Sequence, residues 1–363
     1  MDLLASGPQT SGVPPSDHNI EWYRTPLPPA LSSKLHTLSD AQGAVQTMGF
    51  LSILACCAAS AVYFASTPYH SATVLSVLLY GLVSNFLING MHELGHGTVF
   101  KTPALNAIFL RIVSFLGWLH PDMFFSSHLR HHRFTQNPPH DLENPMPIVL
   151  TLRGFLSFGF VNISGLVEAL TQTVRAAVGL YPTGHLGWLP EWEEVCYPAT
   201  LPQARAPAQR WAAFMLAGHA GIAALGLWQG CAVLPLLLSC GPFLNGWLFW
   251  LCNSTQHVGL QPGVADFRLN TRSFYLHPVL SFLYWRMNYH TEHHMWPRVP
   301  CYHLAELHEA IKHDLPPTPN GLVGVWTAIA GAMKKQELDK GACTVELPAK
   351  RASSVELPDK KGD

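Results

Sequence analysis

Nine of the twenty histidines in this chain occupy positions suited to binding metal ions. Eight of them form three short clusters, at residues 92–96, 128–132 and 290–294, and His257 follows a further apolar run. Neutral imidazole is the commonest metal ligand in proteins. One metal ion rarely takes more than about six ligands, so nine imidazoles indicate two metal ions sharing a site. The candidate ligands are His92, His96, His128, His131, His132, His257, His290, His293 and His294.

The spacing within the clusters is that of helix neighbours. The first cluster reads HxxxH and the other two read HxxHH. Residues at i, i+3 and i+4 lie on one helix face, so each cluster is predicted to present its imidazoles to one side. A single pair of this kind is more often a helix surface or a core pair. Three clusters in a chain with only 12% charged residues favour a metal site, although spacing alone does not choose the metal.

The clusters follow long apolar runs that must position them. Four runs lack charged residues and are mostly apolar: 46–66, 71–90, 211–228 and 231–252. Each is close to the roughly 20 residues that a helix needs to cross a bilayer. The runs are predicted to form transmembrane helices.

The four runs form two hairpins, which turn near residues 67–70 and 229–230. None of the 22 Lys and Arg residues lies in either turn. The positive-inside rule then places both termini, the middle segment and all three clusters in the cytosol. The predicted fold is an all-α integral membrane protein, with four transmembrane helices in two hairpins and a cytosolic histidine-rich cap.

The remaining segments complete the expected organisation. Residues 1–40 are predicted to form a cytosolic arm, residues 41–315 the membrane domain, and residues 316–363 a polar tail that is disordered from about residue 334. Residues 105–119 carry one arginine and favour an interfacial or re-entrant segment, and residues 154–180 favour a helix along the membrane surface. The net charge of −1 identifies no partner, and no nucleic acid is expected among them.

The first cluster also matches the H-E-x-x-H motif of zinc peptidases. In that interpretation His92 and His96 bind zinc, and Glu93 is the general base for a zinc-bound water. Such enzymes need a third ligand, often an aspartate in a Leu-Asp-Gly setting, and no Leu-Asp-Gly occurs here. The peptidase hypothesis also leaves the other seven candidate ligands unexplained, yet it remains an alternative.

Taken together, the three clusters after paired apolar runs resemble the membrane fatty acid desaturase and hydroxylase superfamily. The resemblance covers roughly residues 40–315. The segments 253–257, 141–143 and 288–300 are similar to the regions around the second and third histidine boxes of lipid desaturases. Residues 21–26 and the third cluster also resemble desaturase-like proteins that include small-molecule biosynthetic members.

The resemblance implies an oxidoreductase with two iron ions and O2 as co-substrate. It assigns the nine histidines to ligand positions and Asn253 to a ligand position that acts through a water. Ligating imidazoles usually donate their other N–H to a carboxylate or carbonyl. The candidate carboxylates are Glu93, Asp141, Glu143 and Glu292. Capping or pairing with Arg130 or Arg133 is an equal alternative for Glu93 and Glu292, and the other eleven histidines, among them His219 and His308, are expected to be structural or surface residues.

The predicted function is O2-dependent desaturation of a lipid or other apolar chain. A hydroxylase on the same scaffold is the first alternative, and a metal-binding relative without activity is another. No His-Pro-Gly-Gly pattern of a fused cytochrome b5 domain occurs in the chain. The electrons are therefore expected from an external carrier, cytochrome b5 or a ferredoxin, with its reductase.

The last residues bear on localisation. Lys360 and Lys361 stand at the fourth and third positions from the end, as in the dilysine retrieval signal of membrane proteins. Such an address works only from the cytosolic side, which agrees with the predicted topology. The chain is expected in the endoplasmic reticulum with both termini cytosolic. A lysine-rich solubilising tail is the alternative, and in a bacterial host the plasma membrane is expected instead.

Overall fold

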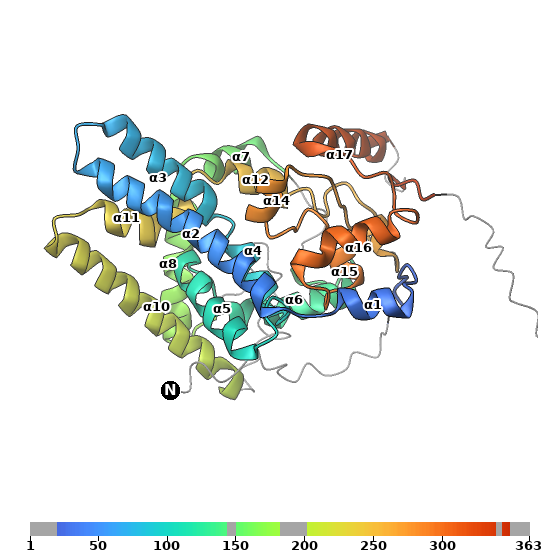
Figure 1. Ribbon diagram of the computed structural model, residues 1–363, viewed down its shortest axis with the longest axis horizontal. Coiled ribbons are helices and arrows are strands. Elements are labelled where there is room, and N and C mark those ends of the chain that lie inside the picture. Colours follow the sequence, from blue (N-terminus) through green and yellow to red (C-terminus); the bar gives the residue numbers. More distant parts are fainter. Residues whose placement is uncertain (1–19, 144–149, 182–201, 339–342, 349–363) are drawn as a thin grey trace, which may run out of the picture.

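The computed structural model describes residues 20–143, 150–181, 202–338 and 343–348. Every regular element in these ranges is a helix, and pairing of extended segments is limited to four isolated bridges. The predicted all-α class is therefore confirmed for this part of the chain. The elements of the membrane hairpins and of the cap lie at opposite ends of the molecule (Figure 1).

The first hairpin begins after the short helix α1 (Pro29–Leu35). It consists of α2 (Asp40–Ala65) and the apolar run His70–Gly95, which combines α3 (His70–Ser84) with α4 (Leu87–Gly95). Ser39 caps α2 by accepting a hydrogen bond from the Gln42 backbone N–H at 3.3 Å. Both runs are 26 residues long, enough to cross a bilayer. Their outward side chains are apolar, as lipid requires.

The second hairpin is irregular. Its first member, α10 (Pro202–Trp228), contains an apolar stretch long enough to cross a membrane. The following segment, predicted as one span at 231–252, divides into α11 (Val233–Cys240), η1 (Gly241–Phe243) and α12 (Trp247–Asn253). The prediction of one continuous helix over this segment was therefore wrong. Pro242 has no N–H for the helical ladder, and Asn245 leaves the helical region with a φ of 51°.

A bent helix pair lies between the two hairpins. Helices α5 (Pro103–Gly117) and α6 (Pro121–Phe134) meet at an angle of 104°. The bend occurs where Trp118 ends α5 in a left-handed conformation, with a φ of 55°. The pair has the length and composition of a broken span or a re-entrant segment, in line with the prediction for 105–119. The described residues thus contain three helices able to cross a membrane, or four if the bent pair counts as one.

Two further helices precede α10. They are α7 (Leu152–Gly159) and α8 (Ile163–Ala177), and α8 packs against α10. Leu152 and Ile163, the first residues of α7 and α8, are 72% and 66% exposed, and Phe160, between the two helices, is 68% exposed. Exposed apolar side chains on short helices are typical of segments at a membrane surface, so a surface position for these helices stays our prediction.

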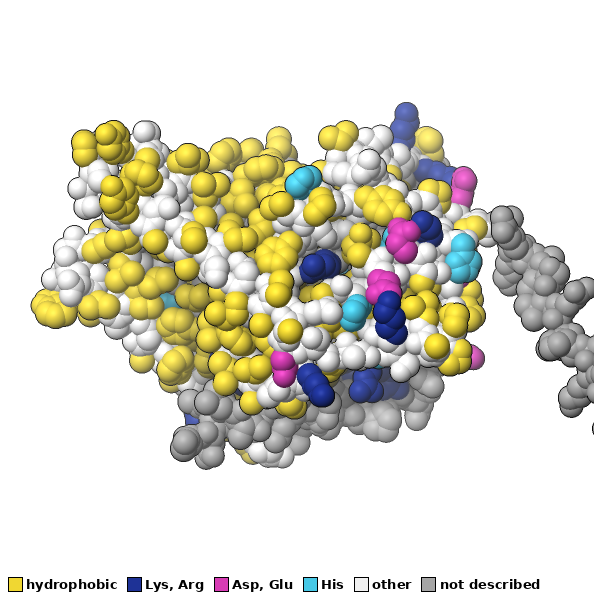
Figure 2. All heavy atoms as spheres, in the orientation of Figure 1, with side chains coloured by type: hydrophobic (Ala, Val, Ile, Leu, Met, Phe, Trp, Pro, Cys, Tyr) yellow, Lys and Arg dark blue, Asp and Glu magenta, His cyan; other side chains and the backbone are white. Residues whose placement is uncertain are grey.

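The cap is built from short helices joined by irregular segments. Figure 2 shows hydrophobic side chains over the hairpins and charged ones gathered over the opposite half. The cap elements are α13 (Phe267–Asn270), α14 (Pro278–Leu283), α15 (His290–Met295), η2 (Cys301–His303), α16 (Leu304–Ile311) and α17 (Gly321–Leu338). Helix α17 continues to Leu338, so the prediction of disorder from about residue 334 was wrong for its last turn. Residues 349–363, with the two terminal lysines, lie outside the described residues.

One core joins the hairpins to the cap. Trp285, Tyr284 and Phe86 are fully buried, and the rings of Phe86 and Tyr284 lie 5.8 Å apart. A Cβ at Gly90 would come within 2.8 Å of the Trp285 ring, so glycine is what allows this close approach. Because α4 carries the first histidine cluster, this packing holds the cluster against the cap.

Candidate metal centre

The structure gathers all nine predicted histidines into two groups. His92, His96, His128, His132 and His293 form the first, and His131, His257, His290 and His294 form the second. Within each group, one imidazole nitrogen per residue lies within 4.8 Å of the others. We call them the five-histidine group and the four-histidine group.

The two HxxHH clusters each contribute to both groups. On α6, His128 and His132 belong to the five-histidine group, whereas His131 belongs to the four-histidine group. On α15 the division is reversed, with one histidine in the first group and two in the second. Adjacent helical residues point about 100° apart, so neighbours within one cluster reach different groups. The predicted common face is therefore shared between two sites.

Helix α4 approaches α6 very closely at the five-histidine group. His92 lies in the last turn of α4, and His96 caps that helix. Between them, a Cβ at Gly95 would lie only 1.9 Å from a ring carbon of Phe125 on α6. Glycine at this position lets the first and second clusters face each other at short range.

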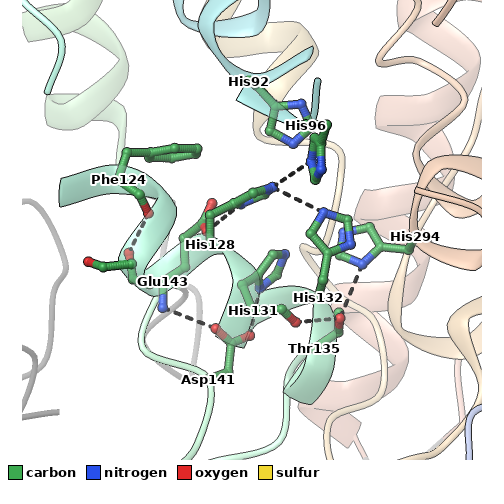
Figure 3. A network of polar contacts seen from close by, with 12 residues as sticks. His92, His96, Phe124, His128, His131, His132, Thr135, Asp141, Glu143 and His294 are labelled. Atoms are coloured by element: carbon green, nitrogen blue, oxygen red, sulfur yellow. Dashed lines mark hydrogen bonds and ion pairs between the residues drawn. The ribbon is translucent and has the colours of Figure 1, made fainter. Parts of the chain in front are cut away.

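Three of the predicted carboxylates orient imidazoles, and Figure 3 shows two of them, Asp141 and Glu143. His128 Nδ1 donates to Glu143 at 2.7 Å, and His131 Nδ1 donates to Asp141 at 2.9 Å. His92 Nδ1 donates to Glu93 at 2.9 Å. Such partners fix which ring nitrogen carries the proton and leave the other free for a metal.

Two orienting groups escaped the sequence reasoning. His257 Nδ1 donates to the Asn270 backbone carbonyl at 2.9 Å. His294 Nδ1 lies 3.1 Å from Thr135 Oγ1, which itself donates to the His131 carbonyl, so the hydroxyl accepts from the ring. Thr135 is distant from His294 in sequence, and Asn270 acts through its backbone carbonyl, so no motif of residue types marks either partner.

The remaining ring nitrogens converge on one another. His128 Nε2 lies 3.1 Å from His96 Nε2 and 3.0 Å from His132 Nε2. Because His128 carries its proton on Nδ1 and donates it in the hydrogen bond to Glu143, the Nε2 atom of the neutral ring has only a lone pair. In the four-histidine group, His290 Nε2 lies 2.9 Å from His257 Nε2 and 3.1 Å from His294 Nε2.

These separations fit a cation. Metal–imidazole bonds of about 2.1 Å at right angles place neighbouring ligand nitrogens about 3.0 Å apart. If His290 carries its proton on Nε2, that proton can be donated to only one of the two neighbouring nitrogens, His257 Nε2 or His294 Nε2. The remaining nitrogen lone pairs repel one another unless a positive charge lies between them. The donor sets of both groups therefore suit a metal ion.

Burial supports the neutral form that metal ligands need. It lowers the pKa of His257 to about 3, and it lowers the pKa of His290 and His294 well below the ordinary value. Burial raises the pKa of Glu143 to about 7, against the opposing effect of His131. Burial also opposes ionisation of Asp141, but the neighbouring His131 holds the pKa of Asp141 below its usual value. Neutral imidazole is the ligating species, so the histidines with a lowered pKa need no proton release to bind metal. His131 is the exception, because Asp141 and Glu143 raise its pKa to about 9 against the effect of burial, and it must lose a proton before it can bind metal.

Glu292 differs from the other three predicted carboxylates in its partners. Glu292 hydrogen-bonds to Ser273 and to Nδ1 of His308, the latter at 2.5 Å, rather than to one of the nine clustered imidazoles. His308, expected to be structural or at the surface, is completely buried behind α15. Asn253 ends α12, four residues before His257, and its water-mediated role stays a prediction.

The geometry also bears on the alternatives. Glu93 is hydrogen-bonded to His92, and it shares its surroundings with imidazoles from α6 and α15. A zinc peptidase interpretation leaves those imidazoles without a role. His219, inside α10, contacts Ser239 at 2.9 Å and the Phe115 carbonyl at 3.1 Å, so its ring is satisfied away from both groups.

Comparison with protein families gives a match over most of the chain. The model of the family described as fatty acid desaturase matches residues 69–324, which is more than half of the chain and includes all nine histidines. Comparison with curated proteins found no match.

Proposed function

This chain belongs to the fatty acid desaturase family, and we propose that it is an O2-dependent desaturase that introduces a C=C bond into a lipid or other apolar chain. The observation that carries the proposal is the pair of buried imidazole groups at the base of apolar hairpins. The hairpins bring such a centre to the membrane, where apolar chains are available.

The two groups would each hold one iron. The five-histidine group would supply its nitrogens from α4, α6 and α15, and the four-histidine group from α6, α15 and the turn after α12. Imidazole sets also suit zinc, copper and nickel. We propose iron because the resemblance to membrane desaturases implies it. When bound, the irons would supply the oxidising power to remove two hydrogens from adjacent methylenes, while O2, two external electrons and two protons give two waters.

The protein's own contribution is positioning and exclusion of water. Asp141 and Glu143 fix the rings of His131 and His128 from one loop after α6. Asp141 is itself held by the backbone N–H groups of Gln136 at 2.8 Å and Glu143 at 3.0 Å. A supporting shell of this kind keeps ligand nitrogens in place and limits side reactions with solvent.

The electron source in this proposal is a separate carrier, cytochrome b5 or a ferredoxin with its reductase. The chain contains no His-Pro-Gly-Gly pattern that would supply a haem of its own. The chemistry consumes two electrons per O2, so turnover depends on that partner. Repeated turnover by the purified chain with O2 alone would contradict this part of the proposal.

The proposed location is the endoplasmic reticulum with cytosolic termini. It is supported by the apolar helices, by the distribution of Lys and Arg, and by Lys360 and Lys361 near the end of the sequence.

The test is product analysis by mass spectrometry after expression with candidate lipids and a reductase system. Desaturation lowers the substrate mass by about 2 units, and hydroxylation raises it by about 16, as the exchanged atoms require. The His257→Ala variant should lose the product, whereas His313→Ala, a change at an exposed histidine, should retain it. A hydroxylated product would replace the desaturase by the hydroxylase alternative, and no iron-dependent product from any lipid would refute both.

A further inference from the structure

A second feature of the cap lies behind the four-histidine group. It is a cavity of about 260 Å³. Its walls come from residues 268–273, from Thr291 at the start of α15, from Leu315–Pro319, from α17 and from the segment Thr344–Glu346. None of the nine clustered histidines lines it, so this cavity is distinct from the candidate metal centre.

The cavity wall holds two arginines in different states. Arg268 is neutralised by Asp266 at 2.7 Å and by Asp314 at 2.6 Å. Arg272 donates from Nη1 to the Thr255 carbonyl at 2.6 Å, and among the described residues it has no carboxylate partner. Burial lowers the pKa of Arg272 to about 10. Glu346 also lines the cavity, but it is exposed, and among the described residues no ion pair joins it to Arg272.

Burying a guanidinium without a paired anion costs free energy of folding. Burial of a charge is tolerated when it is paired or hydrogen-bonded, and one carbonyl uses only one of the five guanidinium N–H donors. The other donors of Arg272 suit a bidentate oxyanion, which is the geometry that guanidinium recognises best. Thr271 and Thr291 lie in the same wall, with their hydroxyl oxygens 3.0 Å apart, and add polar groups beside it.

We propose that this cavity binds the phosphate or carboxylate group of a small molecule or of a lipid headgroup, with Arg272 as its charged partner. The inference goes beyond the proposed desaturation and does not require it. A volume of about 260 Å³ accommodates such a group with a few further atoms.

The position of the cavity couples an occupant to the four-histidine group. Arg272 bonds to the turn before His257 twice, through its side chain to Thr255 and through its backbone N–H to the Gln256 carbonyl at 2.9 Å. Ser273, also in the wall, accepts from the Thr291 N–H at 3.0 Å at the start of α15. An anion on Arg272 therefore stiffens two of the segments that carry this group.

The C-terminal segment closes one side of the cavity. Thr344 donates to the Gly259 carbonyl at 2.7 Å, two residues after His257. Helix α17 supplies Ala328 and Ala332 to the same enclosure, so a larger side chain at these positions would fill the space. Ala330 lies on α17 but is exposed and does not line the cavity, and it gives a matched control.

The test uses the purified, metal-loaded full chain in neutral detergent, titrated at constant ionic strength with inorganic phosphate or with acetate. A ligand that binds only the folded state raises the melting temperature in a saturable manner. We expect this rise for the wild type and for Ala330→Trp. In Arg272→Gln, binding should be at least about tenfold weaker, since a lost charge-assisted hydrogen bond is worth that factor or more. In Ala332→Trp, binding should be weakened by at least the same factor, because the larger side chain fills the cavity.

A second arm identifies the source of the anion. The same variants are measured in bilayers of phosphatidylcholine with or without phosphatidic acid. Stabilisation by inorganic phosphate or acetate alone points to a soluble ligand, and stabilisation by phosphatidic acid alone points to a headgroup. Either result supports the site if Ala332→Trp removes it. The proposal is overturned if no probe stabilises the wild type. It is also overturned if the probes stabilise Ala332→Trp and Ala330→Trp to the same extent. This comparison of the two tryptophan variants remains a valid test even if Arg272→Gln fails to fold.

Discussion

Replacement of Asp141 by Asn separates the two histidine groups experimentally. The carboxylate of Asp141 accepts three hydrogen bonds, from His131 Nδ1 at 2.9 Å and from the backbone N–H groups of Gln136 at 2.8 Å and Glu143 at 3.0 Å. Asparagine keeps the size of the side chain but replaces one acceptor oxygen by an NH2 group. The amide can keep its oxygen toward His131 and Gln136 only by turning its NH2 toward the Glu143 N–H, and the His131 ring then loses its negatively charged acceptor in any case.

The magnitude follows from that count. A buried donor without an acceptor costs about 1–3 kcal/mol, which is roughly a factor of 10–100 in metal affinity if the metal-bound ring is what loses its support. Removal of the orienting partner of a ligating histidine typically lowers metal affinity by the same 10–100-fold. Because Asp141 holds His131, the loss should fall on the four-histidine group, while the five-histidine group keeps its metal.

The assay is metal analysis of the purified Asp141→Asn variant after dialysis against a chelator of graded strength. We expect one of two metal ions per chain to be lost at a chelator strength that leaves the wild type loaded. Asp122→Asn is the matched control on the same segment, since Asp122 pairs with Arg111 at 2.8 Å and contacts none of the nine histidines. Wild-type retention of both metals by Asp141→Asn would refute the assignment of Asp141 as the support of His131.

Three further predictions test the centre, the packing and the address. His257→Ala should lower the iron content by about one ion per chain, because it removes a nitrogen from the four-histidine group; unchanged iron content would remove His257 from the site. Gly95→Ala should destabilise the fold by about 1–3 kcal/mol, because its Cβ would lie 1.9 Å from the Phe125 ring; thermal unfolding measures this, and Gly221→Ala, which meets nothing within 4 Å, should not be destabilised. Replacement of Lys360–Lys361 by serine should release a tagged chain from the reticulum in a eukaryotic cell, and unchanged reticular imaging would exclude the retrieval signal.

Residue types and spacing were sufficient for the main features of the candidate site. Eight of the nine histidines were identified because metal ligands on helices recur at i, i+3 and i+4, and the chain carries such a cluster three times. His257 was identified because it follows an apolar run in a segment that resembles lipid desaturases. Asp141 and Glu143 were proposed because segment 141–143 resembles lipid desaturases and because ligating imidazoles usually donate to a carboxylate, and both carboxylates accept from imidazoles of the second cluster. Length and hydropathy were likewise sufficient for α2, the run His70–Gly95 and α10.

Only the tertiary structure decided how those residues are divided. His131 and His132 are neighbours in sequence, yet they belong to different groups, because a helix turns by about 100° per residue and other helices approach from both sides. Thr135 orients His294 across a large sequence separation, and Asn270 orients His257 through its backbone carbonyl, so no pattern of residue types encodes either contact. The pairing of Glu292 with His308 and the division of the predicted span at 231–252 depend on the same kind of long-range packing. Residue types and spacing therefore predicted which histidines are candidate ligands, and the packing of distant segments decided to which of the two groups each histidine belongs.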